Sequence, residues 1–556
     1  MQLKNNALLY FIPLFLFSYG SAANQITPAD RNILQQQQRE MLEQNRQQRE
    51  ALERSITPSV TTPSQPAVPG GICFPINDIQ LSGAEQLPER ARQQLVRPYL
   101  NQCLGLSQIQ TLVQQVSDWY LNRGYVTSRA FLTEQDLAQG VLRLYVLEGR
   151  LQEILLEQQP SLMLAMAFPG MEGKILNLRD IEQGMEQINR LHRQPVQIDI
   201  LPGDRPGYSR VNLHAAPAFP LQLGLSVDNS GQKSTGVEQI NGSLIGNNLV
   251  GVADQWFISG GRSSAFASDR DAQNVQASVS LPYGYWIADY SYAWSSYLST
   301  FQQQQYAWRY DGASESHRLN VARVLYRNDQ LKTGLTLGLT HRNHRNYLND
   351  IRLQSSSRTL TQWSLGLNHS QKLWGGYGTF NPGFSRGVPW LGAESDQHKS
   401  ADAPRAEFNK WSLSASYFLP LGHEWTWLSS AYGQWSSDRL YGSERLTLGG
   451  ESSVRGFKEQ YLSGDSGGFW RNEISRSLLT LPLLGDLSVL AALDGGYLHS
   501  GPDDSEAKGS LVGGALGISG RNRRVSHQFT LGWPLAYPGW LQPDSVAVYY
   551  HLTLAL

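Results

Sequence analysis

The chain has 556 residues, enough for more than one domain, and its formal net charge of −1 gives no reason to expect a nucleic-acid partner. No apolar run after the N-terminus approaches the roughly 20 residues that a membrane helix needs, which argues against a helical membrane protein. A chain that is polar on average yet rich in Trp, Tyr and Phe is compatible with a transmembrane β-barrel and also with a soluble all-β protein.

Residues 1–23 have the pattern of a secretory signal peptide. Lys4 precedes an apolar core from Ala7 to Phe17 that is too short to span a membrane, and small residues follow it. We therefore expect export, with cleavage after Ala22 or Ala23.

Export has a consequence for the only two cysteines of the chain, Cys73 and Cys103. In an oxidising periplasm we expect them to form one disulfide, and two buried thiols are the alternative.

Residues 24–55 predict a helix that is polar on nearly all sides. Thr27 fits an N-cap, Pro28 the first helical position, and Asp30 completes a capping box. Roughly 27 helical residues make a rod about 40 Å long, which is enough to cross a bilayer-deep pore. Taken alone, the pattern is typical of a solvated helix or a coiled-coil fragment. The Pro-, Ser- and Thr-rich residues 56–72 predict an extended linker.

Two small α/β domains are predicted next, over residues 73–150 and 151–217. The first has a strand around Ile79, helices at 88–101 and 107–123, and strands at 126–132 and 141–149. The second has one helix, at 178–191, and strands at 154–157, 196–201 and 208–214. The element order of the first copy, with its terminal Val-x-Glu-Gly, resembles a POTRA domain.

Residues 218–556 alternate between apolar and polar side chains from Phe219 to the C-terminal Leu556. About sixteen antiparallel strands fit into this length, which predicts a transmembrane β-barrel. We expect short connections on the periplasmic side at 247–254, 281–284, 327–332, 370–376, 419–424 and 481–486.

A Gly- and Ser-rich loop, at about 441–466, interrupts this alternation on the outer side after the eleventh strand. Its Val454, Arg455, Gly456 and Phe457 follow a Leu-Gly-Gly run. This stretch closely resembles the signature loop of the two-partner secretion transporters, a family of the superfamily that also contains BamA-type proteins. Members fold this loop back into the barrel, so the resemblance implies that Arg455 lies inside the pore.

The resemblance covers essentially the whole mature chain and has further implications. It makes residues 24–55 a plug helix in the barrel lumen. Alternation over 487–499 places Asp494 on the lumen side, and the resemblance implies that Asp494 pairs with Arg455; an ordinary lumen carboxylate is the alternative. Arg471 and Glu473 share one face of the twelfth strand and are candidates to line the same pore. Leu556 departs from the usual aromatic C-terminus of exported barrels.

The predicted function is therefore export of a large partner exoprotein (a haemolysin, adhesin or contact-dependent inhibition toxin) bound at the POTRA domains. The protein would be a monomer in outer-membrane lipid, with its POTRA domains in the periplasm and no enzymatic role or cofactor. A BamA-like insertase and a passive porin are the alternatives, and a protease barrel is the enzyme alternative. We expect no metal at His341 and His344, because a loop location is favoured and no other ligands complete a set.

Overall fold

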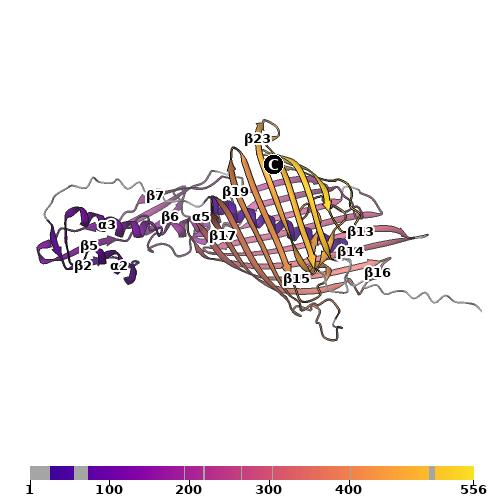
Figure 1. The fold of residues 1–556 in the computed structure, drawn as a ribbon, viewed down its shortest axis with the longest axis horizontal. Helices are drawn as coiled ribbons and strands as arrows, with labels where there is room; N and C mark the ends of the chain where they lie inside the picture. Colours follow the sequence, from indigo (N-terminus) through magenta and orange to yellow (C-terminus); the bar gives the residue numbers. More distant parts are fainter. Residues whose placement is uncertain are drawn as a thin grey trace, which may run out of the picture.

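The structure is a computed structural model that describes residues 26–54, 73–192, 194–216, 219–263, 266–303, 305–400, 402–499 and 508–556. The predicted signal peptide and linker lie outside these residues. Two small α/β domains stand in a row at one end of a large barrel, and helix α1 (Pro28–Glu53) lies within that barrel (Figure 1). None of the described helices is both long and apolar enough to cross a membrane.

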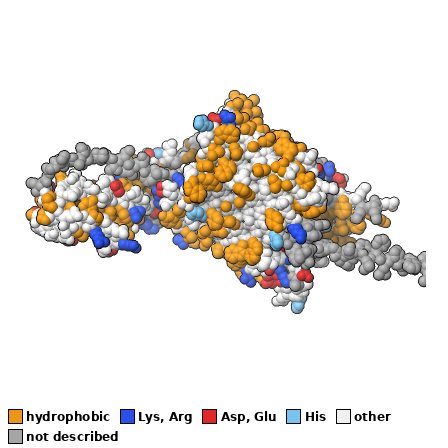
Figure 2. Space-filling view, viewed as in Figure 1, with side chains coloured by type: hydrophobic (Ala, Val, Ile, Leu, Met, Phe, Trp, Pro, Cys, Tyr) orange, Lys and Arg blue, Asp and Glu red, His pale blue; other side chains and the backbone are white. Residues whose placement is uncertain are grey.

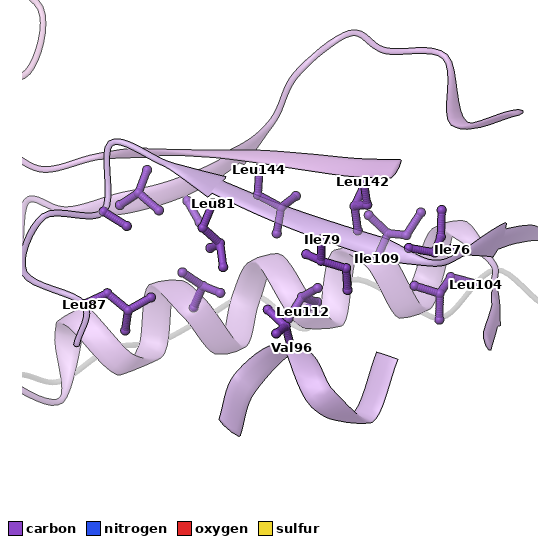
Figure 3. Close-up of a cluster of buried hydrophobic side chains, with 14 of the residues drawn as sticks. Ile76, Ile79, Leu81, Leu87, Val96, Leu104, Ile109, Leu112, Leu142 and Leu144 are labelled. Atoms are coloured by element: carbon purple, nitrogen blue, oxygen red, sulfur yellow. The ribbon is translucent and has the colours of Figure 1, made fainter. Parts of the chain in front are cut away.

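The first α/β domain packs helices against one face of a three-stranded sheet. The sheet has the order β2-β5-β4, and a separate ribbon joins β1 to β3. Apolar side chains from the sheet and helices, including Ile109 and Leu142, are fully buried between them (Figure 3). The elements are β1 (Phe74–Ile76), β2 (Asp78–Ser82), α2 (Glu89–Val96), β3 (Gln102–Leu104), α3 (Leu106–Leu121), β4 (Arg129–Leu132) and β5 (Val141–Leu147).

Two details of this domain differ from the sequence prediction. Helix α2 ends at Val96, well before residue 101, and a 3-10 turn over Arg97–Tyr99 follows it. The reason is Pro98, which lacks the backbone N–H that an α-helix needs to donate to the carbonyl four residues earlier. The short strand β3 was not predicted at all, because three residues carry too little periodic signal.

The second α/β domain has a sheet of order β6-β8-β7. Its elements are β6 (Arg150–Leu156), α4 (Leu162–Ala167), α5 (Leu178–Asn189), β7 (Gln197–Pro202) and β8 (Tyr208–His214). Only one helix was predicted here. The missed helix α4 has six residues, too few to show a helical repeat, and Met163 and Leu164 bury it in the domain core.

The predicted barrel of about sixteen strands is confirmed: sixteen long antiparallel strands close on themselves through the pairing of β27 with β9. Many apolar side chains face outward over these strands (Figure 2). The strands are β9 (Leu221–Asp228), β10 (Gln239–Asn247), β11 (Gln255–Ser263), β12 (Arg270–Tyr283), β13 (Trp286–Gln303), β14 (Tyr306–Arg327), β15 (Leu331–Leu348), β17 (Arg358–Leu373), β18 (Gly376–Gly387), β19 (Asn409–Gly422), β20 (Trp425–Trp435), β23 (Ser466–Leu481), β24 (Gly485–His499), β25 (Gly509–Arg521), β26 (Val525–Ala536) and β27 (Ala547–Ala555).

One prediction about the barrel is wrong. His341 and His344 both lie within strand β15 and not in a loop. Their spacing puts them on opposite faces, so His344 is buried on the lumen side while His341 bonds Thr361 of the neighbouring strand. The polar residues around them suggested a loop, but this part of β15 lies beyond the apolar outer band, where strand side chains can be polar on both faces.

Candidate functional site

The segment between β20 and β23 folds back into the barrel. It contains a 3-10 turn (Gly442–Glu444) and a small hairpin of β21 (Leu446–Leu448) and β22 (Leu462–Gly464). Its apolar side chains, Val454 and Phe457 among them, are fully buried against lumen-facing residues of the wall such as Leu498 of β24. We call residues 441–465 the inward loop. Apolar contacts of this kind fix a loop in place, because leaving the wall would expose them to water.

Arg455 of the inward loop meets Asp494 of β24 in the barrel wall. The guanidinium donates Nε–H to Asp494 Oδ2 and Nη2–H to Oδ1, each at 2.6 Å, and the Arg455 backbone N–H reaches Oδ2 at 3.1 Å. Both residues are almost fully buried, with 3% and 1% of their surfaces exposed. A two-pronged, charge-assisted contact of this kind fixes both position and orientation.

Glu473 and Arg471 of β23 extend this ion pair into a chain of charges. Glu473 Oε1 lies 3.0 Å from Arg455 Nη1 and 2.7 Å from Arg471 Nη2. Arg471 also donates to the backbone carbonyl of Ser452 in the loop, at 3.2 Å. The structure thus brings all four predicted charged residues together: Glu473 lies between two cations that offset its burial, and Asp494 is paired with Arg455.

A second ionic anchor was missed by sequence reasoning. The buried carboxylate of Glu444 in the inward loop binds Arg342 of β15 and Lys410 of β19, each at 2.7 Å. These strands lie on the wall away from Asp494, so the loop is tied to two separate parts of the barrel. The alternation of β15 and β19 places both cations on the lumen side. However, Glu444 is 102 positions from Arg342 and 34 positions from Lys410 in the sequence, and nothing in the sequence indicates contacts over these separations.

Two wall glycines, also missed, let the loop lie directly on the barrel. A Cβ at Gly513 of β25 would stand 1.7 Å from the carbonyl oxygen of Arg455, and one at Gly532 of β26 would stand 2.6 Å from the backbone N of Gly456. Any side chain at either position would push the loop away. The only sequence signal was glycine on the lumen face of a strand, which often marks close backbone approach.

Helix α1 is the second occupant of the lumen. Its N-terminus has the expected capping box, in which Thr27 and Asp30 bond each other's backbone. This end contacts the inward loop: Arg31 donates to the Lys458 carbonyl, lies 3.6 Å from Glu459, and stacks over the ring of Tyr461 at 4.6 Å. About two turns further on, Gln38 donates to the carbonyl of Thr447 at 2.8 Å. Helix and loop therefore meet inside the barrel.

The rest of α1 contacts the wall through polar groups on several sides. Arg318 of β14 binds Glu40 at 2.9 Å, and Gln44 donates to Asn368 of β17 at 2.8 Å. Asn45 accepts from Asn381 of β18 at 2.8 Å. Contacts to several strands explain how a helix without a broad apolar face is held in a wet cavity.

The second α/β domain is joined to the barrel by the turn between β12 and β13. Gln183 of α5 donates to the carbonyl of Gly284 in this turn, and Arg327 at the end of β14 binds Glu186 at 3.1 Å. Burial alone would raise the pKa of Glu186, but the cations Lys332 and Arg327 outweigh it and lower the pKa to about 2. Since this pKa lies below the ordinary value of 4.5, the stabilisation is fully present above about pH 4.5 and is lost progressively as pH falls from there through about 2.

In the first α/β domain, a disulfide joins Cys73 to Cys103, 30 residues further along the chain, and so ties the start of the domain to β3.

The sequence model of the family "haemolysin secretion/activation protein ShlB/FhaC/HecB" matches residues 207–520, and two POTRA models match residues 74–149 and 150–202. The chain belongs to this family. It is 53% identical to the outer membrane transporter CdiB of Escherichia coli, over 98% of this chain and 93% of that protein. It is 32% identical to the hemolysin transporter protein ShlB of Serratia marcescens, over 83% and 81% of the two chains.

A solved structure of CdiB from Escherichia coli superposes with a TM-score of 0.93 at 54% identity, covering 96% of this chain and 99% of that one. These similarities support two-partner secretion over the insertase alternative. They also support an outer-membrane location with the POTRA domains in the periplasm, so the turns next to those domains are periplasmic and the inward loop enters from the outer side.

Proposed function

We propose that this transporter exports one large exoprotein of the contact-dependent inhibition toxin class. The observation that carries the proposal is the end-to-end similarity to CdiB at 53% identity, against 32% for the haemolysin transporter. In this proposal the protein acts as a single chain, which the closed barrel of one chain allows. The exoprotein first binds the periplasmic POTRA domains in extended form, by adding a strand to a sheet edge.

In this proposal α1 is a plug that leaves before export. Support comes from the contacts that its middle part makes with the wall, which join neutral amides and partly exposed charges and could be exchanged for water at little cost. The linker at 56–72 tethers the plug to the first POTRA domain, so the helix can move without unfolding either domain.

The inward loop stays in place and shapes the wall of the path. Support comes from its burial, its two ionic anchors and its fit to Gly513. The Arg455–Asp494 pair holds the loop tip, so the pore cross-section depends on that pair.

Deletion of the gene in its own host tests the proposed function. We expect loss of a single very large protein from the cell surface and culture medium, restored by the wild-type gene on a plasmid. The abundance of other heat-resistant outer-membrane barrels is the internal control. A general fall in barrels would indicate an insertase, and an unchanged set of secreted proteins would refute export.

A further inference from the structure

The hairpin between β23 and β24 projects from the periplasmic rim of the barrel, well away from the row of POTRA domains (Figure 1). Strand β20 begins at Trp425, which pairs with Arg476 of β23. Beyond this point β23 and β24 remain paired to each other up to Leu481↔Gly485. We call residues 478–484 the rim hairpin. It reaches past the neighbouring turn that precedes β20.

The two faces of the rim hairpin follow from the register of β24. This strand pairs with β25 without a shift from Asp494 to Asp486, so Asp486 faces the lumen as Asp494 does. The hydroxyl of Thr480 bonds the carboxylate of Asp486 on that same face. Alternation then puts Leu479 and Leu481 on the outer face, which continues the lipid-facing surface of the wall.

The outer face and the tip of the rim hairpin are apolar and exposed. Leu483 at the tip is 83% exposed and Leu479 is 52% exposed. Hydrophobic side chains cover the projecting end in the space-filling view (Figure 2). By comparison, the turn at 328–330 between β14 and β15 has the polar sequence Asn-Asp-Gln. An exposed apolar surface of this kind is characteristic of contact with a membrane or with a partner.

Three arginines surround the rim hairpin. Arg476 lies at its base on the outer face, with its guanidinium carbon 5.4 Å from the centroid of the Trp425 ring. Arg523 and Arg524 lie in the turn between β25 and β26, which is held against the tip because Asn522 donates to a tip carbonyl at 2.7 Å. All three arginines are exposed, and none forms an ion pair with a carboxylate of the described residues.

The opposite side of the periplasmic rim shows what such cations otherwise contact. There Arg327 and Lys332 both bind Glu186 of α5, so the second POTRA domain supplies their counter-charge. For the arginines at the rim hairpin, the counter-charge has to come from outside the described chain, at the depth where the lipid-facing wall ends. The phosphate groups of the inner leaflet lie at that depth, and the planar guanidinium of Arg suits phosphate.

We propose that the rim hairpin and its arginines form a binding site for anionic phospholipid of the inner leaflet. The leucines of the outer face and tip enter between the lipid headgroups, while Arg476, Arg523 and Arg524 bind the phosphates. The barrel mouth is then held on both sides, by the second POTRA domain on one and by lipid on the other. This site requires only the outer-membrane location and no property of the exoprotein.

Fluorescence quenching in proteoliposomes tests the insertion of the tip. An environment-sensitive fluorophore is attached to Leu483→Cys or, as the matched control, to Gln330→Cys in the polar turn. The native cysteines do not react, because they form a disulfide. The full-length protein is reconstituted in phosphatidylcholine with phosphatidylglycerol. We expect lipids that are spin-labelled near the headgroup to quench the probe at 483 several-fold more strongly than the probe at 330, and aqueous iodide to show the reverse order.

Two other occupants of this surface give different results. If iodide quenches the probe at 483 as well as the probe at 330, the tip stands in water and serves a protein partner that the liposomes lack. Protection from iodide without quenching by lipid would mean that a second copy of this chain covers the tip. Either result would overturn the proposal.

The preference for anionic lipid is tested with the same probe at 483. Quenching by spin-labelled phosphatidylglycerol is divided by quenching by spin-labelled phosphatidylcholine at equal mole fraction. Since one Arg near an anionic surface favours binding by roughly five-fold, we expect a ratio well above one that falls toward one when Arg523→Gln and Arg524→Gln are combined. The control pair Arg270→Gln and Arg352→Gln, exposed on the outer side, should leave the ratio unchanged. A wild-type ratio of one, or a ratio that the first pair does not lower, would overturn the proposal.

Discussion

The inward loop and helix α1 occupy the same lumen but are held there by different kinds of interaction. The loop buries apolar side chains against the wall and carries two ionic anchors. Its backbone lies directly against two wall glycines, Gly513 and Gly532, in the space that a side chain there would fill. The helix has only a few buried apolar residues, such as Leu34 and Leu52, and contacts its surroundings mainly through amides and partly exposed charges.

The difference lies in what replaces each contact when the segment moves. Water can replace a neutral amide hydrogen bond at a net cost of about 1 kcal/mol, so the hydrogen bonds between the helix and the wall can be replaced one at a time. Water cannot replace a packed apolar contact, and separating the buried Arg455–Asp494 pair leaves an uncompensated charge, which costs about 3–5 kcal/mol. The loop is therefore a fixed part of the barrel and the helix a removable one. The following experiments test that distinction.

The largest effect is expected from breaking the loop's ion pair. Arg455→Ala should greatly reduce secretion without preventing membrane insertion, because no barrel strand pairs through this loop. Asp494→Ala should do the same, and the double variant should be little worse than either single change. The measurement is secreted exoprotein relative to transporter in the outer membrane.

Lys458→Ala is the control, since it removes a cation of the same loop that binds no carboxylate and instead donates to the Val548 carbonyl and lies over the Tyr549 ring, as the described residues show. Losses that add up in the double variant would mean that Arg455 and Asp494 act separately, and the pairing would have to be abandoned. Exchange of the two charges should restore only part of the activity, because Asp at position 455 cannot reproduce the forked geometry of Arg.

A slightly smaller loss is expected when the loop is pushed from the wall. Gly513→Ala places a methyl group where the Arg455 carbonyl now lies, at 1.7 Å, so the loop tip must shift. We expect reduced secretion and faster trypsin cleavage at Arg455 in the purified protein. The neighbouring Gly514→Ala points to the other face, where its nearest contact is a Leu535 side-chain carbon at 3.3 Å. If both variants behave alike, the close approach is not what holds the loop.

Removal of the helix tests the other half of the distinction. Deletion of residues 27–55 should raise single-channel conductance and antibiotic entry, while the barrel stays resistant to heat on gels. The physical reason is that the wall strands bond one another and lose only side-chain contacts to α1. Unchanged conductance would refute the plug assignment. A heat-sensitive barrel would mean that the helix contributes to the stability of the barrel and is not a removable part.

The parts that sequence reasoning predicted are those with a local signal. Alternation gave the barrel and put Asp494 on the lumen side, and the Thr27 capping box marked the start of α1. The pairing of Arg455 with Asp494 came from resemblance and not from spacing. The contacts of Glu444 with Arg342 and Lys410 were missed because they cross the lumen between distant strands, where no periodicity operates. The short helix α4 was missed for the opposite reason, since tertiary packing alone holds so short a segment.

The smallest effect is expected from one amide of the plug. Asn45 is buried, and its side-chain oxygen accepts hydrogen bonds from Thr379 and Asn381 of β18. Asn45→Ala removes this acceptor at a cost of about 1 kcal/mol, which corresponds to roughly a five-fold change in the ratio of open to closed channels. The fraction of time that a single channel spends open in planar bilayers is the measurement.

Gln47→Ala is the matched control, because the Gln47 side chain is exposed and bonds only Glu43 of the same helix. It should leave the ratio near the wild-type value. If Asn45→Ala opens the channel as fully as deletion of the helix, the plug depends on a single contact and not on many exchangeable ones. If neither variant changes the ratio, the contacts that Arg31 and Gln38 of α1 make with the inward loop hold the helix in place. Release of the helix would then depend on the inward loop.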